Sequence, residues 1–458
     1  MESGADKGGR VGWLIQVTPD EDKPALLSGL FFFFVLFAVM MLRPVREAMG
    51  VERGMDELRG LFVLTALVSL VVAILFGGLV SRMDRRRFLP IGFRVVMLCL
   101  VGFAVARGVM GDEIKQHAGR VFYVWFSVFN MFVTSIFWAY MADIWRLDQA
   151  KRLYPVIGVG GTLGALAGAS VPWTLGERLE GFGPAWMSGP VWLMLFSILL
   201  FELAVRVMIV LDKWMAQGTS DKPRRTPHAV GGNLIDGLVA VSKSPYLLLI
   251  AMYVGMVAVS STIVYFTGVE LVVDREEELS SRIKLFAQLD VWKQVATLCF
   301  QLFVTSRLIK LIGVGGTLCV LPVLTVAGFT AVWLVGSGSD VLVWGTFAIF
   351  QGFHSASRYA FVRPARETLF SVLSESEKYK AKTVVDMFVY RAGDVAGVGT
   401  EAGLKALGVA SVGAIAVSTM PMAACWVALA LGLGVLQKRR AGSSVVEMKQ
   451  RANDSTRG

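Results

Sequence analysis

Long apolar segments follow one another along almost the whole chain, and they restrict its fold more than any other feature. A helix needs about 20 mostly apolar residues to cross a bilayer. Twelve segments reach that length, at residues 26–49, 59–81, 88–110, 121–145, 153–174, 187–211, 245–270, 284–306, 311–335, 341–373, 381–403 and 410–437. The sequence therefore predicts an all-α membrane protein with twelve transmembrane helices.

The composition excludes two broad classes of protein. Hydrophobic residues make up 55% of the 458 residues and charged residues only 17%, which excludes an ordinary soluble globular protein. The net charge is +10, but the basic residues fall in short clusters between apolar segments, so nucleic acid is not an expected partner. All four cysteines lie in apolar segments without CxxC spacing, which favours packing roles over disulfides or zinc sites.

The basic clusters also predict the orientation of the chain. They occur in alternate loops, and Lys and Arg mark cytoplasmic loops, so an even number of spans puts both termini in the cytoplasm. The expected parts are a cytoplasmic N-terminal segment (1–25) without a cleaved signal peptide, two six-helix halves (26–211 and 245–437), a cytoplasmic linker (212–244) and a cytoplasmic tail (438–458). This plan is typical of secondary transporters, which bind substrate near the membrane midplane between two repeats.

A charged stretch, LRPVREAMG at Leu42–Gly50, interrupts the first apolar segment. On a helix, Arg43, Arg46 and Glu47 project from one face because they stand at i, i+3 and i+4. A charge in a membrane span costs about 2.5–3.5 kcal/mol on insertion scales, so two nearby arginines need a partner or a function. Each arginine either binds a polyanionic substrate through its planar fork or pairs with the neighbouring glutamate.

The same pattern returns more than 300 residues later, again inside a long apolar segment, as Arg363, Pro364, Ala365, Arg366 and Glu367. The recurrence argues against a chance occurrence. Because proline lacks an N–H group, the proline of each copy is expected to kink or unwind its helix and to expose backbone groups to a cavity.

Further charged residues in the predicted spans are candidates for contact with substrate or with a coupling proton. Asp290 and Lys293 share a face of one span, while Asp386, Arg391 and Asp394 lie close together in another. A buried lysine can contact a phosphate, and a buried carboxylate can carry a proton. Stabilising ion pairs are an equally open interpretation.

The fourth and fifth spans carry two patterns of small and polar residues. Asn130, Thr134 and Trp138 recur every four residues, which suits either a water-filled cavity or helix packing. Small residues four apart in the fifth span predict a helix-packing face, and no strand precedes them as a dinucleotide fingerprint would require. They are Gly160, Gly164 and Gly168.

Two loop and span motifs resemble those of known transporters. GGLVSRMDRRR, from Gly77 to Arg87, resembles the G-x-L-x-D-R-x-G-R-R signature of the major facilitator superfamily, with Ser81 at the position of the Asp and Asp84 at that of the second Gly. WAYMADIWRLDQAKRLYPVIG, from Trp138 to Gly158, is similar to the W-x-x-A-N-x-I-T-x-x-E-A-K-R-F-Y-P-L-F-G stretch of bacterial and plastid ATP/ADP antiporters, with Asp143 in place of Asn.

The first-span motif supports the same resemblance. LRPVRE resembles the L-R-D-x-K-D stretch of the antiporters, with Pro44 in place of an acidic residue and Arg46 in place of a substrate-binding lysine. The resemblance covers most of the predicted spans. It implies a major facilitator fold, alternating access, and nucleotide exchange as the leading activity.

Together these features predict a secondary transporter, and not an enzyme, for an anionic, phosphorylated solute, with ATP/ADP exchange as the first candidate. The basic residues expected to bind substrate are Arg43, Arg46, Arg363, Arg366 and Lys293. Those expected to pair with them or to couple protons are Glu47, Glu367, Asp290, Asp386, Asp394 and Arg391. The expected partners are the substrate and the bilayer, without cofactor or metal, for a monomer in a bacterial inner membrane.

Three alternatives stay open at this point. A major facilitator transporter could instead couple protons to another small molecule, such as a drug, a peptide-like fragment or a vitamin. A membrane enzyme acting on lipid would need clustered His, Ser or acidic residues at one membrane face, and the sequence shows no such cluster. A transport-inactive receptor or scaffold would need large exposed loops, whereas the loops here are short.

Overall fold

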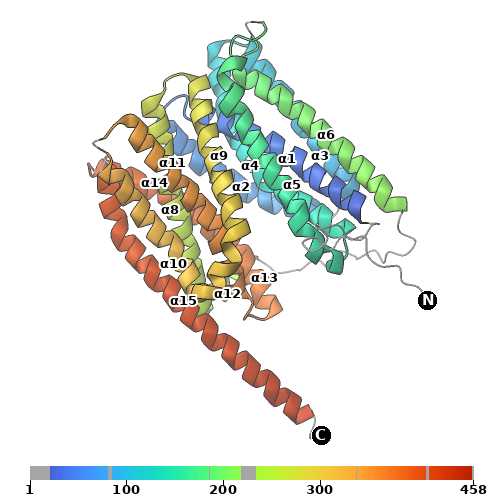
Figure 1. The fold of residues 1–458 in the computed structure, drawn as a ribbon, viewed down its shortest axis with the longest axis vertical. Helices are drawn as coiled ribbons and strands as arrows, with labels where there is room; N and C mark the ends of the chain where they lie inside the picture. The colour runs from blue at the N-terminus through green and yellow to red at the C-terminus, as the bar shows by residue number, and fades with distance from the viewer. Residues whose placement is uncertain are drawn as a thin grey trace, which may run out of the picture. The chain divides into compact units, whose positions relative to one another are not determined.

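The computed structural model describes residues 21–80, 85–184, 186–217, 234–336, 338–408 and 412–455. Within these ranges the chain is helical, with short turns and no strand, so the all-α prediction is confirmed (Figure 1). Residues 1–20 of the predicted N-terminal segment, 81–84 of the loop motif and 218–233 of the predicted linker lie outside the described residues.

The helices follow one another in a simple order along the chain. The first six are α1 (Asp22–Gly50), α2 (Met55–Val80), α3 (Arg85–Val109), α4 (Asp112–Ile144), α5 (Leu147–Leu179) and α6 (Gly189–Gln217). The next four are α7 (Leu234–Lys243), α8 (Pro245–Arg275), α9 (Leu279–Phe303) and α10 (Thr305–Leu334). The last five are α11 (Asp340–Ser357), α12 (Arg363–Phe370), α13 (Glu375–Val384), α14 (Tyr390–Ala406) and α15 (Val412–Ser455). Two π-helical segments, η1 (Arg358–Val362) and η2 (Val385–Val389), join α11 to α12 and α13 to α14.

Eight of the described helices are long and apolar enough to cross a membrane, namely α1, α3, α4, α5, α6, α8, α10 and α15. Counted as uninterrupted runs, the described residues form thirteen helices, of which α7 is too short to span a bilayer. The continuous helices through η1 and η2, and α9, carry the charged residues singled out above, and charge lowers their hydropathy. The count of twelve spans stays a prediction.

The contacts divide the chain into two compact units that are not continuous in sequence. The first unit comprises Met1–Gly54, Val71–Pro227 and Glu276–Gln288, and the second comprises Met55–Leu70, His228–Arg275 and Leu289–Gly458. The first turns of α9 thus belong to the first unit, and the first turns of α2 belong to the second. The continuous halves expected from the sequence stay a prediction.

In the first unit, α1 packs against α4, α5 and α6. The packing face predicted on α5 lies directly on α1. A Cβ atom at Gly160, Gly164 or Gly168 would lie 2.4, 2.2 or 2.4 Å from a backbone carbonyl oxygen of α1. Any larger residue there would push the helices apart, so the prediction of a packing face is confirmed.

In the second unit, α8 packs against α14 and α15, and α10 runs side by side with α15 (Figure 1). Two buried tyrosines satisfy their hydroxyl groups inside this core. Tyr246 donates to the carbonyl of Leu369, and Tyr253 donates to that of Leu318, each at 2.9 Å. The short helix α7, at the end of the predicted linker, packs on α13 and buries Val241.

Candidate functional site

Arg46, from the first copy of the charged pattern, is anchored by three contacts within the first unit. Its Nε donates to Oγ of Ser127 in α4 at 2.9 Å, and its Nη1 donates to Oε1 of Glu47 at 2.5 Å. Its guanidinium carbon lies 3.8 Å from the ring centroid of Tyr123. These ion-pair, hydrogen-bond and cation–π contacts stabilise a charge whose side chain is only 13% exposed.

The residues around Arg46 keep α1 intact. Arg43 is half-buried one turn earlier, and Pro44 and Glu47 are buried. The α-helix continues through Pro44 to Gly50, so the predicted unwinding does not occur there. Packing of α1 against three neighbouring helices compensates for the hydrogen bond that proline removes.

The sequence analysis missed Tyr123 and Ser127, although a helical signal for them exists. Both precede the predicted polar stripe on α4 at spacings of three or four residues, and Asn130, Thr134 and Trp138 continue it as half-buried side chains. The same face of α4 therefore carries both the partners of Arg46 and the predicted cavity residues.

Trp138 itself packs among aromatic rings. Its ring centroid lies 5.4 Å from that of Phe32 in a T-shaped contact and 5.0 Å from that of Tyr154. These contacts agree with the packing interpretation, and a cavity-lining role for Trp138 stays a prediction. A cavity-lining role for Asn130 and Thr134 stays a prediction.

Arg366, from the second copy of the pattern, is held more loosely in the second unit. Its Nη1 lies 2.9 Å from Oδ1 of Asp386, and its Nη2 lies 3.7 Å from Oε1 of Glu367. Its Nε is buried and has no hydrogen-bond acceptor among the described residues. The side chain is 14% exposed, so this nearly buried guanidinium has one donor that is unsatisfied.

Other charges surround Arg366. Nζ of Lys382 lies 2.7 Å from Oε2 of Glu367, and both side chains are more than one-third exposed. Arg363 is exposed and makes no ion pair among the described residues. The second unit therefore brings Arg366, Glu367, Lys382 and Asp386 together from α12, α13 and η2.

Two π-helical segments hold these charges. In η1 the backbone N–H of Arg363 bonds to the carbonyl of Arg358, five residues back. Pro364 explains the change, because its ring clashes with the carbonyl four residues earlier and it has no N–H to donate. In η2 the widened turn carries Asp386. π-Helical turns are frequent at functional sites, where they redirect side chains.

Two further predicted pairs form within single helices. In α9, Nζ of Lys293 lies 3.1 Å from Oδ1 of Asp290, whose carboxylate is buried. In α14, Nη1 of Arg391 lies 3.0 Å from Oδ2 of Asp394, and Oγ1 of Thr262 donates to the other oxygen at 3.4 Å. These contacts agree with the pairing interpretation, and a role in binding substrate or a proton stays a prediction.

Arg358 is a charged residue that the sequence analysis overlooked. Its Nη1 donates to the hydroxyl of Tyr390 at 3.3 Å, and its Nη2 donates to the hydroxyl of Tyr359 at 3.1 Å. An arginine in an apolar segment five residues before Arg363 is itself a costly feature, and that signal would have identified it.

The arrangement in the second unit suits an anionic ligand with several oxygens. A guanidinium can donate to two oxygens of a carboxylate or phosphate at once. In this structure the guanidinium of Arg366 pairs with Asp386. A phosphate could take the place of that carboxylate. No group of three or more metal-ligating side chains occurs within the described ranges.

Comparisons with known proteins agree with a transporter fold. A family model described as TLC ATP/ADP transporter matches residues 114–434, and a model described as Major Facilitator Superfamily matches residues 10–172. The first of these matches covers well over half of the chain.

Two chlamydial proteins are similar in sequence. ADP,ATP carrier protein 1 of Chlamydia pneumoniae is 23% identical over 350 residues, which cover 69% of this chain and 66% of the carrier. The protein of the same name from Chlamydia trachomatis is 22% identical over 325 residues, which cover 63% of this chain and 60% of the carrier. The aligned region spans less than two thirds of either carrier.

Solved structures share the fold at low sequence identity. A mutant of the nucleoside transporter NupG superposes with a TM-score of 0.59 at 12% identity, covering 91% of this chain and 99% of that chain. A bacterial homologue of the human lysosomal transporter Spinster, solved in an inward-facing and unoccupied conformation, superposes with a TM-score of 0.51 at 14% identity. The superposition covers 94% of this chain and 95% of that chain. The apolar helices identify a multi-pass membrane protein, and the match to the family model over residues 114–434 shows that the chain belongs to the TLC ATP/ADP transporter family.

Proposed function

We propose that this chain is a secondary transporter that exchanges ATP and ADP, or closely related phosphorylated anions, by alternating access. The observation that carries the proposal is the guanidinium of Arg366, which is nearly buried, paired with Asp386 and more distantly with Glu367, and left with an unsatisfied donor at Nε. The printed function of the chlamydial relatives, ADP and ATP carriage, supplies the first substrate to test.

In this proposal the basic residues have different roles. Arg366 binds a phosphate group, and the exposed Arg363 adds charge at the same helix end. Arg43, Arg46 and Lys293 contribute positive potential, while their carboxylate partners limit the cost of charge in a membrane protein. Arg391 and Asp394 act as a separate pair.

In the proposed mechanism, the carboxylate of Asp386 and a phosphate of the substrate compete for the guanidinium of Arg366. In the empty carrier Asp386 holds Arg366, as in the present structure. A substrate phosphate releases that pair and forms its own contacts with Arg366. The Asp386–Arg366 pair would hold the empty carrier in one conformation. Bound substrate would break that pair and bring the two conformations closer in free energy, so that only the loaded carrier alternates.

The proposal also includes the topology expected from the sequence. The chain would cross a bacterial inner membrane twelve times as two six-helix halves, act as a monomer, and keep both termini in the cytoplasm. The alternation of basic loops supports this orientation.

A proton-coupled transporter of another small molecule is the second candidate. It is favoured by the buried carboxylates of Asp290 and Asp394, which are 2% and 5% exposed. Either carboxylate could carry a proton across a membrane-embedded site.

Exchange in proteoliposomes tests the two candidates. Labelled ATP is supplied outside, and the vesicles contain ADP, inorganic phosphate or buffer alone, with and without a pH gradient. We expect rapid uptake only with internal nucleotide and little effect of the gradient. Uptake into buffer-filled vesicles that follows the gradient would support proton coupling. Absence of ATP uptake by folded, correctly oriented protein would remove nucleotide as the substrate.

A further inference from the structure

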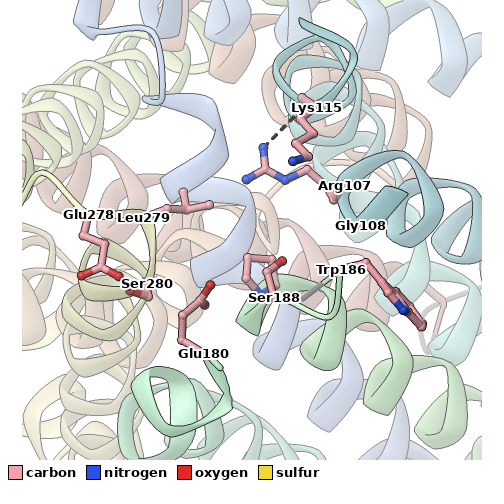
Figure 2. Close-up of a pocket in the computed structure, with 10 residues that line it drawn as sticks. Arg107, Gly108, Lys115, Glu180, Trp186, Ser188, Glu278, Leu279 and Ser280 are labelled. Carbon is pink, nitrogen blue, oxygen red and sulfur yellow. Dashed lines mark hydrogen bonds between the residues drawn. The ribbon is translucent and has the colours of Figure 1, made fainter. Parts of the chain in front are cut away.

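A polar pocket of about 190 Å³ lies in the first unit, and its lining residues are distinct from the charged pattern of α1 (Figure 2). It forms where α3 and α5 end and where α4, α6 and α9 begin. The side chains that matter here are Arg107, Lys115, Glu180, Ser188, Glu278 and Ser280. By the predicted orientation of the loops, this end of the helices faces the extracytoplasmic side.

Arg107 supplies a buried donor to the pocket. Its side chain is 8% exposed, and its Nη1 lies 3.1 and 3.0 Å from the two carboxylate oxygens of Glu52. The same nitrogen donates to the carbonyl of Lys115 at 3.3 Å. Nε of Arg107 is buried and has no hydrogen-bond acceptor among the described residues. A buried donor without an acceptor costs free energy, and a bound oxygen would remove that cost.

The pocket separates its charges. Figure 2 shows Arg107 and Lys115 on one side and Glu180 and Glu278 on the other. The two carboxylates are held in place, because Oε2 of Glu180 accepts from the backbone N–H of Gly189 at 2.9 Å and Oε1 of Glu278 accepts from the hydroxyl of Ser280 at 2.7 Å. A simple anion would meet two carboxylates here, and a simple cation would meet two basic groups.

A ligand with both charges satisfies both sides. We propose that the pocket binds a zwitterion that joins a phosphate to a primary ammonium group, as in the head group of phosphatidylethanolamine or in free phosphoethanolamine. The phosphate accepts from Arg107 and Lys115, and the ammonium donates to Glu180 and Glu278. Trp186 borders the pocket and is 48% exposed, which suits the level of lipid head groups, where tryptophan is enriched.

Lipid binding to the full-length, delipidated protein tests the inference by native mass spectrometry, which needs no transport activity. Phosphatidylethanolamine and phosphatidylglycerol with identical acyl chains are compared as probes. We expect phosphatidylethanolamine to bind about tenfold more tightly, because only it offers an ammonium to the carboxylates. Glu278→Gln is expected to abolish this difference, whereas Arg107→Gln is expected to weaken the binding of both lipids, because both carry the phosphate.

Two further arms separate the sources of the head group and control for folding. Arg206→Gln is the matched control, since Arg206 is 72% exposed and pairs with Glu202 in α6 outside the pocket. Glu278→Gln leaves the Arg107–Glu52 pair intact, so it reports on the pocket even if Arg107→Gln folds poorly. Displacement of the lipid by soluble phosphoethanolamine would show that the free zwitterion suffices, and its failure to displace the lipid would assign the site to lipid.

Binding of the lipid head group and binding of free phosphoethanolamine both support the inference, because both ligands join a phosphate to an ammonium group. Equal affinity for the two lipids would overturn the inference, as would variants that match Arg206→Gln. Displacement by inorganic phosphate as effective as that by phosphoethanolamine would also overturn it, because the ammonium would then contribute nothing.

Discussion

The two copies of the R-P-x-R-E pattern have different surroundings in the two units. Arg46 has an acceptor for Nε on a neighbouring helix, an adjacent carboxylate and an aromatic ring beneath its guanidinium. Arg366 has Asp386 and a more distant glutamate, and its Nε has no acceptor in the described part of the chain. The same pattern therefore gives one anchored arginine and one that keeps an unsatisfied donor.

The backbone differs as well. α1 continues as an α-helix through Pro44, whereas π-helical turns precede Pro364 and carry Asp386. π-Helical turns are rare and are frequent at functional sites. In the proposed function, the first copy mainly supports the fold and the second copy binds the substrate.

The largest expected effect is on stability. Arg46→Gln removes the partner of Glu47, whose side chain is 7% exposed, and breaking a buried pair costs about 3 kcal/mol. We expect a clear fall in the thermal unfolding temperature of the purified protein, measured by intrinsic fluorescence. Arg206→Gln, at an exposed pair, should change it little. An unfolding temperature for Arg46→Gln equal to that of this control would show that Arg46 is not anchored.

The next effect is on transport. Arg366→Gln removes a charged donor to phosphate, so ATP exchange should fall about 100-fold while the unfolding temperature stays near that of the wild type. Initial rates in proteoliposomes, normalised to the reconstituted protein, provide the measurement. Exchange within twofold of the wild type would contradict the assignment of Arg366 as the main phosphate ligand.

A smaller effect is expected at the internal partner. Asp386→Asn frees Arg366 in the empty carrier, because the amide carries no charge. Release of labelled nucleotide into buffer without counter-substrate should then rise about tenfold over the wild type, since a part-buried ion pair no longer holds the empty state. Glu202→Gln is the control at a pair in the other unit. Release as slow as that of the control would break the proposed link between this pair and strict exchange.

The smallest effect concerns a single hydrogen bond. Ser127→Ala removes the acceptor of Nε of Arg46 but leaves Glu47 and Tyr123 in contact with the guanidinium. We expect a loss of about 1 kcal/mol in stability and nearly unchanged exchange. A large loss of exchange with normal stability would instead show that the first copy is as functional as the second.

Features local to one helix could be predicted from the sequence. The pairs Asp290–Lys293 and Arg391–Asp394 form because residues three apart lie on one helical face. The packing of α5 on α1 followed from Gly160, Gly164 and Gly168, since small residues four apart leave a groove for another backbone. Helix formation itself followed from the long apolar segments.

Contacts between helices could not be predicted in this way. Ser127 lies 81 residues from Arg46, and no local pattern connects the two. Asp386 was a candidate partner, but its pairing with Arg366 depends on how α12 and η2 pack. The polar pocket at Arg107 was not foreseen, because its side chains come from four helices and the connections between helices.

The sequence alone determined that this chain is a helical membrane protein and that two arginine pairs need a reason to lie within apolar segments, because the cost of charge in lipid depends on composition and not on packing. Only the tertiary structure decided that Nε of Arg46 has an acceptor and that Nε of Arg366 has none among the described residues. That difference depends on the neighbours that other helices bring to each guanidinium, and identical five-residue patterns contain no information about them.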